Sequence, residues 1–171
     1  MSDFRKLGTL HDNADPDPPG ARRSHTLHAG ELFATSEPTA VRTRLDSCVA
    51  VCLWDWQARI GGIAHFVLPT GGRNAPNLAH YANLALPELV AQLEALGCTR
   101  RRLLAKVFGG SCRAEASAGG DLGARNVAAA DELLDALDIP VVARDVGGAS
   151  ARKLTLHTDD FGVWVWRIRA R

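Results

Sequence analysis

Cys48 and His65 are the residues of this chain best suited to carry out chemistry. Cys48 stands at the head of one apolar run, and His65 lies within a second one. A cysteine thiol and a histidine imidazole are the minimum parts of a nucleophile with its base, and such a pair acts on acyl groups. The alternative is a buried cysteine and a hydrogen-bonded core histidine that do no chemistry. Spacing alone does not separate the two.

The pair can meet only if two neighbouring strands bring it together. Residues 48–54 are apolar on both faces, which predicts a buried strand, and residues 59–68 predict another. Residues 55–58 between them predict a hairpin turn. Two paired strands of this length would place His65 beside the start of the first strand, where Cys48 lies.

The start of that first strand suits a nucleophile. Asp46-Ser47 is a turn signal directly before Cys48, so the sulfur can be exposed there. Backbone N–H groups at Ser47 and Cys48 could point at a developing oxyanion. Either Ser47 or Thr43 could orient the imidazole of His65.

The other cysteines give no sign of a metal site or a disulfide. Cys48 and Cys52 are four residues apart, which is about 13 Å on a strand, so they can neither share a metal nor form a disulfide. Cys52 is expected to fill the core. Cys98 and Cys112 stand alone, without a CxxC pair. A cysteine nucleophile needs no metal and no organic cofactor, and we expect none.

The remaining pattern predicts a single domain of mixed α and β structure. Amphipathic spacing predicts a helix over residues 81–96, ended by Gly97; either the helix proper begins near Pro87, or an earlier turn is kinked there. A second helix is predicted over residues 123–137, with Asp121 as a possible cap. The last strand is apolar on both faces, which predicts a central or sandwiched position. Two helices are too few for a doubly wound fold with this many predicted strands. We therefore expect a sandwich of mixed β-sheets with the helices outside. The predicted strands cover residues 27–34, 39–45, 48–54, 59–68, 102–108, 139–146, 154–157 and 162–169.

Composition limits where the protein works and what it binds. The chain has 171 residues and a net charge of +1, so no overall field favours nucleic acid or membrane. Residues 1–24 are polar and proline-rich, which predicts a disordered tail before a domain over residues 25–171. No apolar run reaches about 18 residues and no signal peptide is evident, so we expect a cytoplasmic protein with reduced thiols.

Glycine-rich turns supply the remaining candidates. Gly109, Gly110 and Ser111 follow one predicted strand, and Asp145 ends another before a second glycine pair. These four residues could line a pocket, although such glycines more often permit tight backbone geometry. Neither turn matches a phosphate-binding loop.

Several separated motifs in one order resemble the CheD family, the chemoreceptor glutamine deamidases of bacterial chemotaxis. The resemblance covers about residues 27–169. It is carried by SCVAVCL at 47–53, IAHFVLP at 63–69, YAN at 81–83, KVFGGS at 106–111, LGARNV at 122–127 and DVGG at 145–148.

The resemblance implies roles for three residues. Cys48 would be the nucleophile, His65 its base and Thr43 the third member of the set. It also implies a sandwich like that of toxin deamidases, and hydrolysis of chemoreceptor glutamine amides to glutamate without a cofactor. Some members bind the phosphatase CheC, and some hydrolyse receptor methyl esters.

The chain departs from the family pattern at three places. Asp46 replaces the usual glycine before Ser-Cys, where a left-handed backbone would be strained and where a carboxylate should raise the pKa of the nearby thiol. Ala151-Arg152 stands where Gly-Arg is usual, and Pro87 is unusual in the first helix. These departures keep two other hypotheses open: a weakly active module that docks on receptors or a CheC-type phosphatase, and a different thiol hydrolase such as a methylesterase.

Overall fold

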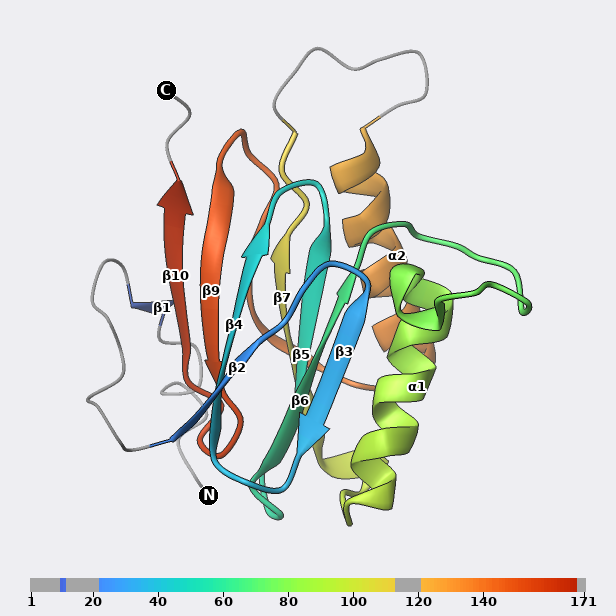
Figure 1. The fold of residues 1–171 in the computed structure, drawn as a ribbon. Coiled ribbons are helices and arrows are strands. Elements are labelled where there is room, and N and C mark those ends of the chain that lie inside the picture. Colours follow the sequence, from blue (N-terminus) through green and yellow to red (C-terminus); the bar gives the residue numbers. More distant parts are fainter. Residues whose placement is uncertain (1–9, 12–21, 113–120, 169–171) are drawn as a thin grey trace.

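The fold is a sandwich of two five-stranded sheets with both long helices on one outer face (Figure 1). The computed structural model describes residues 10–11, 22–112 and 121–168. Sheet A has the strand order β1 (Leu10–His11), β10 (Val163–Ile168), β9 (Ala151–His157), β4 (Thr39–Leu45) and β2 (Arg23–Thr26). Sheet B has the order β3 (Glu31–Thr35), β6 (Ile60–Phe66), β5 (Val49–Asp55), β7 (Leu103–Gly109) and β8 (Val141–Val146). Both sheets mix parallel and antiparallel pairs, which confirms the predicted fold class.

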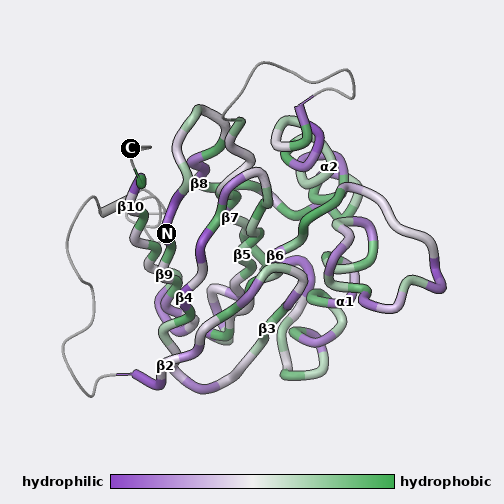
Figure 2. The backbone as a smooth tube through the Cα atoms, turned by 45° about the horizontal axis from the view of Figure 1, so that its top comes forward, coloured by the Kyte–Doolittle hydropathy of each residue, from purple (hydrophilic) through white to green (hydrophobic). Residues whose placement is uncertain are grey.

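Two apolar layers hold the sandwich together. One lies between the two sheets, and the other between sheet B and helices α1 (Ala82–Ala95) and α2 (Leu122–Ala136). Figure 2 shows the same order of layers from another angle. Every residue of β5 is buried because this strand lies between both layers, as its two apolar faces predict. Cys52 is fully buried in the layer between the sheets, which confirms it as core filler.

Both helices lie close to their predicted positions. The first starts at Ala82 and runs through Pro87, which excludes a start at the proline. It ends before Gly97, whose φ of +101° is the left-handed conformation that glycine adopts at little cost. The Asp121 carboxylate accepts a hydrogen bond from the Ala124 N–H at 3.2 Å, so it caps α2 as expected. Short 3-10 turns, η2 (Leu78–His80) and η3 (Arg100–Arg102), precede α1 and β7.

The predicted strand over residues 27–34 is wrong as a single element. The chain leaves sheet A after β2, crosses at residues 27–30, and enters sheet B as β3. Gly30 makes this crossing possible because its φ is +79°, and a Cβ there would lie 2.2 Å from the His80 ring. The crossing brings the Leu27 carbonyl close to the candidate active site.

The last strand is not central, which corrects a second prediction. β10 has β9 on one side and only the two-residue β1 on the other. Val163 and Val165 face the layer between the sheets, whereas Trp164 and Trp166 lie on the outer face and are half-buried. The second apolar face therefore belongs to the molecular surface.

Most of the predicted disordered tail lies outside the described residues. Within residues 1–24, Leu10–His11 pairs with β10, and β2 begins at Arg23, so these parts are strands. Arg22 is also engaged, since its guanidinium contacts the Asp159 carboxylate at 2.7 Å. The domain boundary at residue 25 stays a prediction.

Asp55 anchors the end of β5 opposite the candidate active site. Its buried carboxylate accepts backbone N–H groups of Gln57, Ala58 and Thr99 at 2.9–3.0 Å and the Arg102 guanidinium at 3.0 Å. Burial by itself would raise the pKa of Asp55, but the hydrogen bonds from Arg102 and the three N–H groups hold it below its ordinary value.

Asp55→Ala should lower the free energy of unfolding by on the order of 3 kcal/mol, because it leaves buried donors and a guanidinium without their acceptor. Urea denaturation measures the change. Asp131→Ala is the matched control, since Asp131 forms an exposed ion pair with Arg144 that should contribute little. Equal losses in the two variants would contradict this account of Asp55.

Candidate active site

A hydrogen bond between Thr43 and His65 joins the two sheets. Thr43 lies on β4 of sheet A, between Val41 and Leu45 on the inner face. His65 lies on β6 of sheet B, and its Nδ1 is 2.9 Å from Thr43 Oγ1. Both side chains are buried. Of the two orienting residues that the sequence left open, Thr43 is therefore the one in contact with the imidazole.

The Thr43 hydroxyl also fixes which imidazole nitrogen carries the proton. Thr43 Oγ1 lies 2.8 Å from the Leu27 carbonyl oxygen, which can only accept. The single hydroxyl proton is therefore donated to Leu27, and the same oxygen must accept from His65 Nδ1–H. Nε2 of His65 is then the unprotonated nitrogen, as a general base requires.

Strand register places Cys48 near the end of β6 that carries His65. In the β5–β6 pair His65 is directly opposite Ala50, and Phe66 is opposite Val49. Cys48 directly precedes Val49, in the turn that leads into β5. Cys48 is half-buried at the end of its turn.

Nε2 of His65 is buried and has no hydrogen-bond partner within the described residues, the Cys48 thiol included. The thiol–imidazole hydrogen bond is thus not made in this structure. Such contacts are often loose before substrate binds. A buried nitrogen that carries a lone pair beside a half-buried thiol is nevertheless the arrangement that proton abstraction needs.

Burial keeps both members of the pair neutral. Desolvation raises the pKa of the Cys48 thiol, and the Asp46 carboxylate raises it further, against a lowering effect of the cysteine's own backbone N–H. Desolvation also lowers the pKa of His65 to about 4, although nearby Glu31 opposes this shift. At neutral pH the resting state is therefore a thiol beside a neutral imidazole.

The turn that carries Cys48 is held by its carbonyl groups. The carbonyls of Asp46, Ser47 and Cys48 accept hydrogen bonds at 2.8–3.0 Å. Their donors are, in that order, the Ser111 N–H, the Asn126 side-chain amide and the Gly110 N–H. Three consecutive carbonyls fixed in this way define where Cys48 sits.

The glycine turn predicted as a pocket lies directly against the nucleophile's turn. A Cβ on Gly109, whose φ is +104°, would lie 2.3 Å from the Cys48 carbonyl oxygen. Gly110 and Ser111 donate the backbone bonds described above, and the Ser111 hydroxyl also bonds to the Asp46 carboxylate. In this structure these residues support the nucleophile, and a pocket-lining role stays a prediction.

Asp145 is engaged by two arginines. Its carboxylate accepts from Arg152 at 2.9 Å and from Arg167 at 3.0 Å. These bonds hold the pKa of Asp145 below its ordinary value although burial opposes them. Asp145 borders a hollow of about 270 Å³ together with Gly147 and Gly148, and a catalytic use of that hollow stays a prediction.

Sequence reasoning missed the role of Asn126. Its buried side-chain amide donates to the Ser47 carbonyl at 3.0 Å and to the Val67 carbonyl at 2.8 Å. One residue of α2 therefore ties the nucleophile's turn to the end of the strand that carries His65. A polar residue at an inward position of a helix, spaced with buried Gly123 and Ala130, is the signal that could have revealed it.

Asp46 causes no left-handed strain. Three described non-glycine residues have positive φ, namely Arg59, Asp138 and Phe161, and Asp46 is not among them. The departure from the family's glycine therefore acts through charge, since it raises the pKa of Cys48 as expected.

Two negative findings concern the described residues alone. No group of three or more His, Cys, Asp or Glu side chains is placed to hold a metal ion. No helix is long and apolar enough to cross a membrane.

The buried neutral His65 should make stability depend on pH. The unfolded chain binds a proton on this residue near pH 6.5, whereas the folded chain does so only near pH 4. The free energy of unfolding should therefore fall as pH drops through this window, by up to about 3 kcal/mol from His65. Urea denaturation from pH 7 to pH 4 measures the slope.

His65→Asn should flatten that slope, and His25→Asn is the matched histidine control that should retain it. Identical slopes for the wild type and His65→Asn would show that His65 is not the buried neutral group.

One family model and several curated relatives match this chain. Residues 67–167 match the family model described as CheD chemotactic sensory transduction. A protein of Anaeromyxobacter dehalogenans named "Probable chemoreceptor glutamine deamidase CheD 1" is 45% identical, over 96% of this chain and 99% of its own length. Proteins named "Probable chemoreceptor glutamine deamidase CheD" from Rhodospirillum rubrum and Sulfurimonas denitrificans are 41% and 36% identical, over 84% and 78% of this chain and 82% and 86% of their own.

Among solved structures, a Neisseria meningitidis protein of the DUF152 family aligns with a TM-score of 0.47 and 12% identity. It covers 75% of this chain and 65% of its own, a likeness too distant to inform the chemistry. The family match spans more than half of the sequence, and the first relative aligns over nearly all of both chains. The chain therefore belongs to the CheD family.

Proposed function

We propose that this protein is a chemoreceptor glutamine deamidase that uses Cys48 as its nucleophile. The observation that carries the proposal is the Thr43–His65 hydrogen bond, which leaves His65 Nε2 unprotonated on the strand paired with the one that Cys48 directly precedes. The names of the relatives supply the substrate: a glutamine side chain of a chemoreceptor.

The first half of the reaction forms a thioester. His65 Nε2 takes the proton from the Cys48 thiol as the sulfur attacks the carbon of the glutamine side-chain amide. Negative charge develops on the amide oxygen, where N–H groups of Ser47 and Cys48 would stabilise it. The imidazolium then gives its proton to the amide nitrogen, the C–N bond breaks, and ammonia leaves.

The second half releases the product. His65 takes a proton from a water molecule, which attacks the thioester carbon. The C–S bond breaks, and the sulfur recovers a proton from the imidazolium. The receptor now carries glutamate, and the protein returns to its starting state. Throughout, Thr43 holds the Nδ1–H side of the ring, the part that the third residue plays in other triads.

Cys48→Ala should abolish the modification because it removes the atom that forms the thioester. The wild type, incubated with a cytoplasmic fragment of a chemoreceptor, should release ammonia and raise the fragment's mass by the amide-to-acid difference. Cys112→Ala is the matched control, a cysteine of similar exposure that should leave turnover intact. Identical fragment masses from the wild type and Cys48→Ala would sink the deamidase proposal, and release of methanol would indicate ester hydrolysis instead.

Thr43→Val should lower kcat by about 100-fold, because the isosteric side chain cannot accept the His65 Nδ1–H bond. The Michaelis constant should change little, since Thr43 does not bind the reacting amide. Thr43→Ser keeps the hydroxyl and should restore most of the turnover. Equal kcat values in Thr43→Val and Thr43→Ser, with both variants folded by circular dichroism, would rule out this orienting role.

A further inference from the structure

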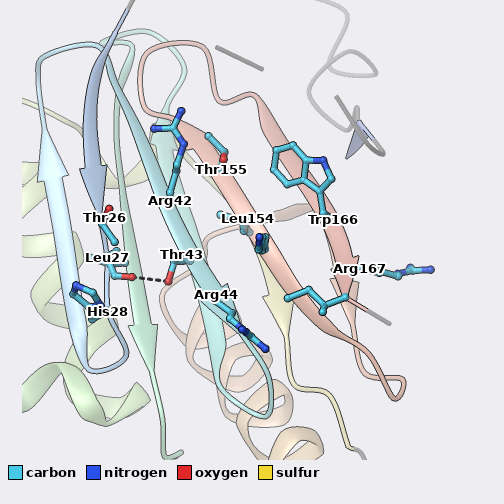
Figure 3. Close-up of a pocket in the computed structure, with 12 residues that line it drawn as sticks. Thr26, Leu27, His28, Arg42, Thr43, Arg44, Leu154, Thr155, Trp166 and Arg167 are labelled. Carbon is cyan, nitrogen blue, oxygen red and sulfur yellow. Dashed lines mark hydrogen bonds between the residues drawn. The ribbon is translucent and has the colours of Figure 1, made fainter. Parts of the chain in front are cut away.

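The outer face of sheet A carries a groove that the reaction does not use (Figure 3). It has a volume of about 830 Å³ and runs across β4, β9 and β10. Its walls include the cationic side chains of Arg42, Arg44 and Lys153 and the indole of Trp166. Arg167 also borders the groove, but its guanidinium bonds to the Asp145 carboxylate. The residues that line the groove all lie in the described part of the chain, and none of them is acidic.

Two of the positive charges in this groove lie directly opposite each other. Arg44 on β4 is directly opposite Lys153 on β9, and both are exposed. Like charges that face each other across two strands destabilise a sheet. Lys153 is in turn opposite Trp166 on β10, so the three side chains form one row across the outer face. An anionic group lying on this row would relieve the repulsion between Arg44 and Lys153.

The groove also borders the candidate active site. Thr43 lies between Arg42 and Arg44 on β4, lines the groove, and contacts His65 on its inner side. Leu27, which accepts the Thr43 hydroxyl, is a second residue shared by the groove and the site. Arg44 precedes Cys48 by four residues, so their Cα atoms are no more than about 15 Å apart.

We propose that this groove binds a carboxylate-rich segment of the chemoreceptor while the target glutamine on the same receptor reaches Cys48. The inference rests on the proposed function and adds to it the charge of the substrate. Two exposed cations in register recognise carboxylates, and the Trp166 indole beside Lys153 offers an apolar surface. Each turnover replaces a neutral amide with a carboxylate, so the same surface favours receptor segments that have already been modified.

The double variant Arg44→Glu/Lys153→Glu tests the proposal. Its Michaelis constant for a chemoreceptor cytoplasmic fragment should rise by about tenfold or more at low salt, with kcat little changed. Added salt should weaken the wild type's affinity for the fragment more than the variant's, because screening removes the attraction. The control Arg73→Glu/Arg101→Glu reverses two exposed charges away from the groove and should leave the Michaelis constant unchanged.

A short uncharged glutamine peptide separates docking from chemistry, because the groove variant should process it as the wild type does. If the groove variant loses activity on this peptide as well, the neutral pair Arg44→Gln/Lys153→Gln takes its place, with a smaller rise expected. Fragment kinetics equal to those of the control double variant would overturn the proposal.

Binding of the fragment to Cys48→Ala protein, with and without the groove substitutions, tests the surface independently of turnover. If the wild type fails to deamidate the fragment but the groove substitutions still weaken binding, the proposed function fails and the docking surface stands. If DNA or vesicles of anionic lipid bind the groove and the receptor fragment does not, the surface has another partner and this proposal is wrong.

Discussion

The hydrogen bond from His65 to Thr43 is the constraint on which the rest of the site depends. It places two polar side chains inside a mostly apolar layer between two sheets, where an unmade hydrogen bond would be costly. The Leu27 carbonyl removes the ambiguity of the hydroxyl, because a carbonyl oxygen cannot donate. The Leu27 carbonyl, in the crossing between the sheets, thereby determines which nitrogen of the His65 ring on β6 carries the proton. The fold needs its irregular crossing at residues 27–30 for this reason.

A second set of contacts fixes the nucleophile relative to that ring. The Cys48 turn is held by its carbonyl groups, with donors from the glycine turn after β7 and from α2. Asn126 also reaches the Val67 carbonyl just beyond the His65 strand. The backbone beside Cys48 and the backbone beside His65 are thus both held by α2. Positive φ at Gly109 lets the backbone approach closely enough to complete this arrangement.

The parts of this fold that follow from local pattern could be predicted from the sequence. The β5 and β6 strands, both helices, the Asp121 cap and the buried position of Cys52 all depend on periodicity or on a few neighbouring residues. The predictions that were wrong concern segments whose contacts lie far away along the chain. Residues 27–34 read as one strand because nothing local shows that the chain changes sheets within them, and the Trp face of β10 read as buried because apolar side chains can also line a surface groove.

The residues of the candidate site likewise divide into those that could be predicted from the sequence and those that could not. Residue type and position selected Cys48 and His65, but they left Ser47 and Thr43 equivalent. The family resemblance favoured Thr43, and the packing of the sheets puts Thr43 in contact with His65. The Asn126 amide and the Ser111 N–H donate to carbonyls 79 and 65 residues away along the chain. A local pattern can mark Asn126 as an inward polar residue, but it cannot identify the distant partner.

The neutral state of the Cys48–His65 pair has a consequence for selectivity. Oxidants and electrophiles attack thiolates, so a thiol kept protonated by burial and by Asp46 is a poor target for them. In the proposed reaction the sulfur becomes nucleophilic as His65 Nε2 takes its proton. An inhibitor of this protein must therefore obtain its affinity from contacts with the surface around Cys48. A compound that relied on its reactive group alone would react first with most other cellular thiols.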